Sequence, residues 1–441
     1  MSVNYLDIKP SDICECGKRH AATVNDVLIG NGVASYLPEL LEKYGAKKVF
    51  VIADVNTYAV AGDRVCSLIE SAGCDVSKYV FADKNLEPDE HAVGSAIMHF
   101  DNTCDTIVSV GSGVINDISK IVATVADRTY FIVGTAPSMD GYASATSSMA
   151  RDGVKVSLNS KCPDVIIGDI DIVKTAPDRM LQAGLGDMLA KYVGVCEWRI
   201  ANIISGEYYC ERIARLVRTA LKKCVDNADG LLARDDEAIK AVFEGLVITG
   251  LAMSYAGVSR PASGGEHYMS HVWDMRALEF GLKADLHGTQ CALGTLYSAR
   301  LYEKLKSVTP DKKKATAYVD AFDFAKWSDE LRKGLGSAAE PMIALEAKER
   351  KYDKSTHSAR FDRIADNWDK IVDIIDSEMP TGDEIYALLT KIGAPKTAED
   401  IGVDPKILPF TLKATKDIRD KYVLSRLLWD LGLLDEYAEE L

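Results

Sequence analysis

Three of the seven histidines lie close together in the second half of the chain, where they could bind a metal ion. His267 and His271 are four residues apart, which places them on one face of a helix, and His287 follows beside a glycine. A Gly-Leu-Gly-Asp segment ends at Asp187, which we expect at the start of a helix. One aspartate and two histidines suit zinc, nickel or iron and leave positions open for a substrate oxygen. Histidines that only pack in a core are the alternative, but the set as a whole favours a metal site.

A glycine-containing segment at 110–120 (VGSGVINDISK) directly follows a predicted strand and opens a predicted helix. Gly111 and Gly113 would let the backbone approach a diphosphate, and the helix N-terminus offers N–H groups and a favourable dipole. The segment lacks the third glycine of the common dinucleotide motif, and glycines also serve ordinary strand-to-helix turns. The sequence therefore predicts a diphosphate site here, with a plain turn as the alternative.

Two further polar segments follow predicted strands. Asp54 ends one strand, where a carboxylate can accept hydrogen bonds from ribose hydroxyls and repel a 2′-phosphate, which favours NAD over NADP. A helix cap is an equally common role for such an acid. The segment 134–144 (GTAPSMDGYAS) brings small hydroxyl side chains to the end of another strand, where α/β sheets bind ligands, although a merely polar turn would have the same composition.

The elements that must position these residues change type once along the chain. Short β-rich runs alternate with helix-length segments up to about residue 173, which is typical of a parallel, Rossmann-like sheet. Helical periodicity follows, and the uncharged stretch 245–258 is too short to span a bilayer, so we expect a buried core helix there. We predict an α/β dinucleotide-binding domain at 1–173 and an all-α metal- and substrate-binding domain at 174–441. The expected strands are 48–53, 77–80, 106–110 and 129–133.

Composition excludes several classes of protein. With 441 residues, 47% of them hydrophobic, the chain can bury a large core. The formal net charge of −14 argues against a nucleic-acid partner, because binding nucleic acid needs a basic surface. We find neither a signal peptide nor an 18-residue uncharged apolar run, so we expect a cytoplasmic protein without a membrane partner.

Cys14, Cys16 and His20 form the one local cluster of soft ligands near the N-terminus. A structural zinc ion normally has four ligands, and no second Cys/His pair stands nearby in the sequence. The favoured interpretation is a turn that carries thiols in a reducing compartment.

Three segments give the chain a resemblance to a known family. They are 138–142 (SMDGY), 186–191 (GDMLAK) and 259–267 (SRPASGGEH). They resemble the sn-glycerol-1-phosphate dehydrogenases, within the wider group of iron-type alcohol dehydrogenases, glycerol dehydrogenases and dehydroquinate synthases. The resemblance runs from about Val27 to Tyr302 and leaves the charged helical extension after about Lys304 uncovered.

The resemblance implies roles for individual residues. Asp187, His267 and His287 would hold a divalent metal, zinc or nickel, while Asp140, Asp187 and His271 would face the substrate. Ser112 and Val114 depart from the residues that many relatives carry there. The dinucleotide, NAD or NADP, would contact Asp54, Gly111, Ser112, Gly113, Val114, Ile115, Thr135, Ser138 and Ser144.

The expected reaction is the reduction of dihydroxyacetone phosphate to sn-glycerol 1-phosphate by NADH or NADPH, in a homo-oligomer. Asp187 and His271 are the expected catalytic residues, His271 because an imidazole titrates near neutral pH. Arg260 is the expected ligand of the substrate phosphate, with a surface ion pair as its alternative role. The competing functions are a glycerol or other polyol dehydrogenase, a cyclase similar to dehydroquinate synthase, and an inactive nucleotide-binding protein.

Overall fold

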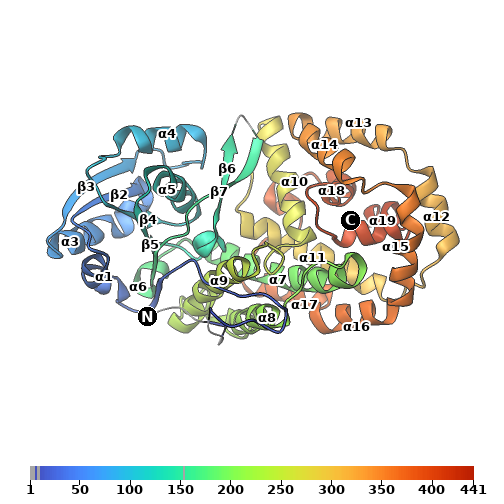
Figure 1. Cartoon of the computed structure of the whole chain (residues 1–441), viewed down its shortest axis with the longest axis horizontal. Helices are drawn as coiled ribbons and strands as arrows, with labels where there is room; N and C mark the ends of the chain where they lie inside the picture. The colour runs from blue at the N-terminus through green and yellow to red at the C-terminus, as the bar shows by residue number, and fades with distance from the viewer. Residues whose placement is uncertain (1–4, 7–9, 152–153) are drawn as a thin grey trace. The chain divides into compact units, whose positions relative to one another are not determined.

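The computed structural model describes residues 5–6, 10–151 and 154–441 (Figure 1). Two compact units divide the chain, residues 1–188 with 215–258 and residues 189–214 with 259–441. The division passes through two continuous helices, α7 (Asp178–Ser205) and α8 (Glu211–Asp226). The chain therefore contributes more than one segment to each unit.

A six-stranded parallel sheet forms the centre of the first unit. Its strands run in the order β1-β8-β5-β4-β2-β3, and every pair in it is parallel. The four predicted runs coincide with β2, β3, β4 and β5, so the predicted Rossmann-like α/β fold is confirmed. The strands are β1 (Asp26–Gly30), β2 (Lys48–Asp54), β3 (Asp75–Phe81), β4 (Thr106–Gly111), β5 (Thr129–Gly134) and β8 (Val165–Asp169).

Helices pack on both faces of this sheet, because side chains of each buried strand alternate between the two faces. Val49 and Val51 belong to a core with α1 (Leu37–Tyr44) and α3 (Asp63–Ser71). Phe50, on the opposite face, meets Phe100 directly after α4 (Glu90–His99), with 5.2 Å between the ring centroids. Next to α4, α5 (Gly113–Ala126) packs against β4 and β5 (Figure 1). The short helices α2 (Val55–Thr57) and α6 (Ile170–Val173) follow β2 and β8.

A second, two-stranded sheet was not predicted. It is the antiparallel hairpin of β6 (Thr146–Arg151) and β7 (Val154–Asn159). Its first strand has the sequence TSSMAR, whose serines give little β signal. Tertiary contacts hold it instead, since the Ser148 N–H donates to the Asp117 carboxylate of α5 over 3.2 Å.

Helix α9 (Asp236–Ala256) completes the first unit. It is the one helix in the described part of the chain that is long and apolar enough to cross a membrane, yet 78% of its most apolar window is buried. Phe243 explains part of this burial, because a Cβ atom on Gly168 would lie 2.3 Å from its ring and one on Gly134 2.8 Å. The predicted buried core helix is confirmed.

The second unit is helical. Its helices α10 and α11 pack against each other, α17 packs on α11, and α18 packs on α10. The strands end at Asp169, close to the predicted boundary near Lys174, although the units do not separate there because α9 packs with the sheet. The helices are α10 (Gly265–Phe280), α11 (His287–Leu305), α12 (Lys312–Ala321), α13 (Phe324–Leu335), α14 (Ala339–Glu349), α15 (Lys354–Asp366), α16 (Trp368–Glu378), α17 (Gly382–Lys391), α18 (Leu408–Thr415), α19 (Leu424–Asp430) and α20 (Leu434–Ala438).

Candidate active-site residues

The turn between β4 and α5 has the tight geometry that a diphosphate site needs. A Cβ atom on Gly111 would lie 2.4 Å from Cβ of Ile115, and one on Gly113 would lie 3.1 Å from Cε of Met139. Packing therefore requires glycine at position 111, while a side chain at position 113 would press on the flexible end of Met139. Ser112 occupies the N-cap position of α5 without a capping hydrogen bond from its side chain, so the first N–H groups of α5 belong to the loop predicted to bind the diphosphate. Val114 lies in that first turn.

The loop after β5 lies at the same edge of the sheet. The Thr135 N–H donates to the Gly111 carbonyl over 3.0 Å and joins the ends of β4 and β5. Thr135 and Ser138 are both buried. The Ser144 hydroxyl is committed within the protein, because it donates to the Thr146 carbonyl over 2.9 Å. Ser144 therefore holds the loop as well as being a predicted dinucleotide contact.

Lys120 also lies in this region, although it was not predicted as a site residue. Its side chain is fully buried, and its ammonium lies 2.8 Å from the Asp117 carboxylate. The same ammonium donates to the carbonyls of Gly141 and Thr146, and to the Ser144 hydroxyl. The spacing of Asp117 and Lys120 on one helix was visible in the sequence, but their common target was not. Lys120 fixes the loop that follows β5 onto the helix that follows β4.

Asp54 ends β2, the strand beside β4, and so lies at the same edge as Gly111. Its Oδ1 accepts hydrogen bonds from the N–H groups of Asn56 and Thr57, at 2.7 and 2.9 Å. Asp54 is thus a helix cap, one of the two roles the sequence left open. A carboxylate has a second oxygen, so the cap is compatible with a predicted ribose contact.

Asp187 and Asp140 lie together in the first unit. The Asp140 N–H donates to Oδ2 of Asp187 over 2.9 Å, and Asp187 is fully buried. The expectation that Asp187 starts a helix is wrong, because it lies well inside α7. The glycines before it serve close packing rather than a turn, since a Cβ atom on Gly184 would lie 1.7 Å from the Pro137 carbonyl oxygen.

His267 lies in the first turn of α10 beside a buried carboxylate. Its Nδ1 is 2.7 Å from Oε1 of Glu266, and that oxygen also accepts the Gly264 N–H over 2.9 Å. When Glu266 is ionised its oxygens can only accept, so Nδ1 of His267 then carries the proton. Its Nε2 is left with a lone pair, the state in which an imidazole binds a metal ion.

His287 begins α11 and reaches the same tautomer by another route. The Ser270 hydroxyl lies 2.6 Å from Oε1 of Gln290, to which it donates, and 3.0 Å from Nδ1 of His287. A hydroxyl has one proton, so Nδ1 of His287 must donate to Ser270. Nε2 of His287 therefore also carries a lone pair.

The three predicted histidines lie together in the second unit. The ring of His287 is 5.1 Å from that of His267 and 6.0 Å from that of His271, between centroids. The pair of helices α10 and α11 thus brings all three imidazoles to one place. Cys291, one turn after His287, also comes within ligand distance of His267 and His287, and the sequence did not single it out.

Two buried carboxylic acids lie behind the histidines at the start of α10. Glu197 accepts the N–H groups of Gly265 and Leu424, each over 2.9 Å. Burial raises the pKa of Glu197 to about 8 and that of Glu266 to about 7. A Cβ atom on Gly264 would lie 2.6 Å from the Glu197 carboxylate, so glycine at this position lets the two acids approach the helix start.

Arg260, the predicted phosphate ligand, bonds other groups of the protein. It is buried, and its guanidinium forms a two-pronged ion pair with Glu207, with 2.6 Å between Nε and Oε2. A third donor bonds the Tyr422 carbonyl over 3.0 Å. These bonds occupy the guanidinium fork that could otherwise bind a phosphate, and the ion pair joins a buried arginine to a half-buried glutamate. The structure therefore gives Arg260 a part in holding the helical unit.

Residues 28–177 match the sequence profile of the family described as iron-containing alcohol dehydrogenase. A glycerol-1-phosphate dehydrogenase (NAD(P)+) from Halalkalibacterium halodurans is 34% identical over 294 residues, which cover 66% of this chain and 74% of the relative. Another, from Bacillus licheniformis, is 28% identical over 436 residues, or 98% and 95% of the two chains. The latter match also includes the extension after Lys304, which the sequence resemblance had left uncovered.

Solved structures show the same fold. A glycerol dehydrogenase from Schizosaccharomyces pombe has a TM-score of 0.61 at 16% identity, with 96% of this chain and 92% of the other covered. A putative alcohol dehydrogenase from Ralstonia eutropha has a TM-score of 0.62 at 15% identity, with 96% of each chain covered. The sequence matches place the chain in the glycerol-1-phosphate dehydrogenase family, among the iron-containing alcohol dehydrogenases.

Proposed function

We propose that this protein is a metal-dependent oxidoreductase that reduces dihydroxyacetone phosphate to sn-glycerol 1-phosphate with NADH or NADPH. The relatives' shared name supports the substrate and the dinucleotide. The observation that carries the proposal is the matched state of His267 and His287, whose Nδ1 atoms both donate and whose Nε2 atoms both keep a lone pair.

The residues present fit a divalent metal ion. Asp187 supplies a carboxylate oxygen, and His267 and His287 supply two imidazole nitrogens, a set that zinc and nickel accept. When bound, the metal ion supplies Lewis-acid chemistry at the ketone oxygen of the substrate. The Asp140 N–H orients the Asp187 carboxylate, and Glu266 and Ser270 orient the two imidazoles.

The remaining predicted residues bind the dinucleotide and the substrate. The N–H groups at the start of α5 bind the diphosphate, and Asp54 contacts the adenosine ribose. Lys120 keeps the loop with Thr135, Ser138 and Ser144 against that helix. His271 donates a hydrogen bond or a proton to the substrate oxygen as the alcohol forms.

The first test compares substrates and variants in one assay. NADH oxidation should be stoichiometric with dihydroxyacetone phosphate consumed, and a cyclase that regenerates its NAD would show no net oxidation. His267→Ala should lose turnover and the metal ion bound by Asp187, His267 and His287. His99→Ala is the matched control, because His99 is exposed at the end of α4, where it bonds the Ser95 carbonyl and stacks on Tyr79. Unchanged metal content and turnover in His267→Ala would disprove the site.

A polyol dehydrogenase that uses the same residues is the second candidate. The observation in its favour is that Glu207 and the Tyr422 carbonyl occupy the guanidinium of Arg260, the residue expected to bind the phosphate. Comparing kcat/KM for dihydroxyacetone phosphate and for dihydroxyacetone separates the two. A large preference for the phosphate supports the first proposal, and equal values support the second.

A further inference from the structure

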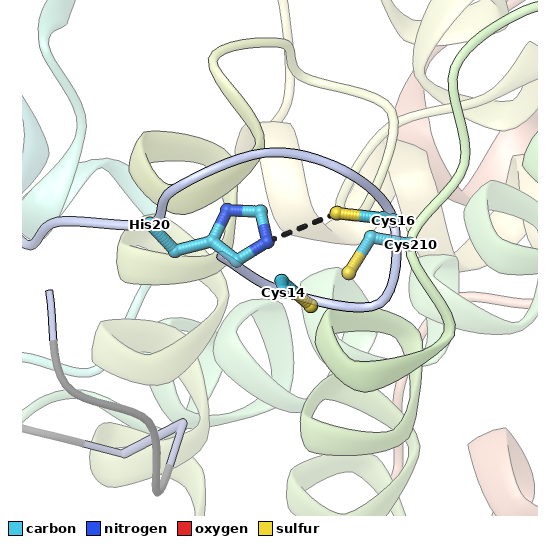
Figure 2. A group of neighbouring side chains, drawn as sticks. All are labelled: Cys14, Cys16, His20 and Cys210. Carbon is cyan, nitrogen blue, oxygen red and sulfur yellow. Dashed lines mark hydrogen bonds between the residues drawn. The ribbon is translucent and has the colours of Figure 1, made fainter. Parts of the chain in front are cut away.

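A second group of metal-binding side chains lies at the N-terminal end of the described chain. Figure 2 shows Cys14, Cys16 and His20 directed toward one another, with Cys210 beside them. One ligand atom from each residue lies within 4.8 Å of the others. The sequence showed three ligands and favoured a turn with thiols, because the fourth comes from a distant part of the chain.

His20 is held in the state that a metal ligand needs. Its Nδ1 lies 2.8 Å from the Tyr255 carbonyl oxygen, which can only accept, so Nδ1 carries the proton. Nε2 therefore keeps a lone pair, and it faces Sγ of Cys16 at 3.3 Å (Figure 2). A backbone carbonyl that orients the ring in this way is a common partner of metal-bound histidines.

The backbone between the two cysteines forms a tight turn. The Gly17 N–H donates to the Cys14 carbonyl over 2.8 Å, and the Cys14 N–H donates to the Lys18 carbonyl over 2.9 Å. Gly17 has a φ of 82°, a conformation that favours glycine. The turn thus brings the side chains of residues 14, 16 and 20 together without a helix or strand.

Cys210 stands directly before α8, and its carbonyl accepts the N–H of Ala214 over 3.0 Å. The division between the units passes through this helix, whose residues from Arg215 onward belong to the first unit. There, α8 is fixed to α9 by a hydrogen bond from the Cys224 thiol to the Ala241 carbonyl, 3.2 Å long. Tyr255, which orients His20, lies at the end of the same α9.

The burial and spacing of the four groups fit a closed tetrahedral site. Cys14, His20 and Cys210 are 4%, 2% and 1% exposed, so little water reaches the cluster. With zinc–sulfur and zinc–nitrogen bonds of about 2.3 and 2.0 Å, tetrahedral geometry separates sulfur from nitrogen by roughly 3.6 Å. The 3.3 Å between Cys16 and His20 is close to that edge length.

We propose that Cys14, Cys16, His20 and Cys210 bind one structural zinc ion, separate from the metal ion proposed for Asp187, His267 and His287. Three thiolates and one imidazole complete a four-coordinate shell, so no position remains for substrate. The ion would fix residues 14–20 to the start of α8, and the bond from His20 to Tyr255 holds them at the end of α9. This role makes up for the lack of regular secondary structure between residues 10 and 25.

The test measures zinc bound to the full-length enzyme and its release by a thiol-specific mercurial. Wild type should release one zinc equivalent per chain when the mercurial is added. Cys210→Ser and Cys14→Ser should lose that equivalent, while His267→Ala should keep it. Cys74→Ser is the matched control, since Cys74 is buried in the same unit but donates to the Ala46 carbonyl.

Cobalt substitution gives an independent measurement on folded protein. Thiolate–cobalt charge-transfer absorption should appear in the wild type, vanish in Cys210→Ser, and persist in His267→Ala and Cys291→Ser. A wild-type enzyme that releases no zinc to the mercurial overturns the proposal, and the cluster is then a set of hydrogen-bonded thiols. Loss of the absorption only in Cys291→Ser also overturns it, because the thiolate would then belong to the histidine group. None of these outcomes depends on which substrate the enzyme reduces.

Discussion

His267 and His287 reach the same protonation state through chemically different partners. Glu266 is a buried acid that accepts a hydrogen bond from His267 directly. The Ser270 hydroxyl instead donates to Gln290 and so accepts from His287. A neutral relay of this kind costs less desolvation than a second buried carboxylate would. One imidazole is therefore oriented by an acid and the other by a neutral hydroxyl.

Replacing Ser270 with alanine should weaken metal binding without removing a ligand. Nδ1 of His287 loses its acceptor, so the ring is no longer held in one tautomer, and metal affinity should fall by about 10- to 100-fold. Competition titration with a chelating dye measures this. Ser298→Ala is the control, because Ser298 is buried on α11 and its hydroxyl bonds no described residue. Equal metal affinity in the two variants would contradict the role of Ser270.

At this scale the sequence predicted residue types better than residue partners. The three histidines were recognised because rare metal ligands cluster within few positions, and Asp187 because of the glycines before it. The partners Ser270 and Gln290 carry no comparable signal, since serine and glutamine are common in any helix. Cys210 could not be joined to Cys14 before the fold was known, because the contact spans most of the first unit's sequence.

Helices α7 and α9 pack tightly against the loop that carries Asp140. A Cβ atom on Gly184 of α7 would lie 1.7 Å from the Pro137 carbonyl oxygen, and one on Gly250 of α9 would lie 2.9 Å from the Asp140 carbonyl oxygen. Glycine inside a helix lowers the stability of that helix. At these two positions it allows the helix backbone to approach the loop closely. The loop is thereby held from two helices.

Gly184→Ala should lower the free energy of unfolding by more than about 2 kcal/mol and reduce turnover, because the backbone at Pro137 must move. Gly94→Ala is the matched control. Gly94 lies inside helix α4 with no atom within 4 Å of an added Cβ, so alanine there should be neutral or stabilise by up to about 1 kcal/mol. Chemical unfolding and NADH oxidation report both quantities. A Gly184→Ala enzyme as stable and active as Gly94→Ala would refute the close-packing account.

Helices and strands were predicted correctly where the local sequence pattern agrees with the burial of the element. β4 and β5 are short apolar runs buried on both faces, which is how parallel strands differ from helices in sequence. The start of α7 follows Pro177, a residue type that is frequent at helix starts. Asp187 was placed at a helix start because its glycines resemble a turn, and only the contact with Pro137 shows why glycine occurs inside α7.

The second unit contains a buried ionic cluster away from the histidines. The ammonium of Lys416 lies 3.1 Å from the Asp417 carboxylate and 3.6 Å from the centroid of the Trp327 ring. Burial lowers the pKa of Lys416 to about 8, while the opposite charge of Asp417 acts in the other direction. Glu346 and Arg426 also act on it. Keeping Lys416 charged in the folded protein therefore lowers its stability, by an amount that depends on pH.

This cost predicts a difference between wild type and Lys416→Met. The folded enzyme releases the Lys416 proton near pH 8, and the unfolded chain releases it near the ordinary value of 10.5. Between these values the unfolded state binds more protons, so wild type should gain stability relative to the variant as the pH rises, by roughly 3 kcal/mol at most. Chemical unfolding across this window measures it, with Lys413→Met on the same helix as a control for loss of a lysine. A constant difference between wild type and Lys416→Met would contradict the burial effect.

The organisation of the whole chain was only partly visible in its sequence. The change from strands to helices near Lys174 is a local property, and the sequence contains it. The grouping of α9 with the sheet depends on Phe243 meeting Gly134 and Gly168, contacts that join positions far apart. Neither periodicity nor composition could indicate them.

That grouping also sets the order in which the protein can be completed during synthesis. Residues 26–169, which include every strand of the parallel sheet, leave the ribosome well before Phe243 does. The small patch formed by Gly134 and Gly168 stays uncovered until α9 has emerged. A fragment that stops at residue 173 would keep this patch open permanently. The sheet therefore needs a part of the chain made much later to finish its own core.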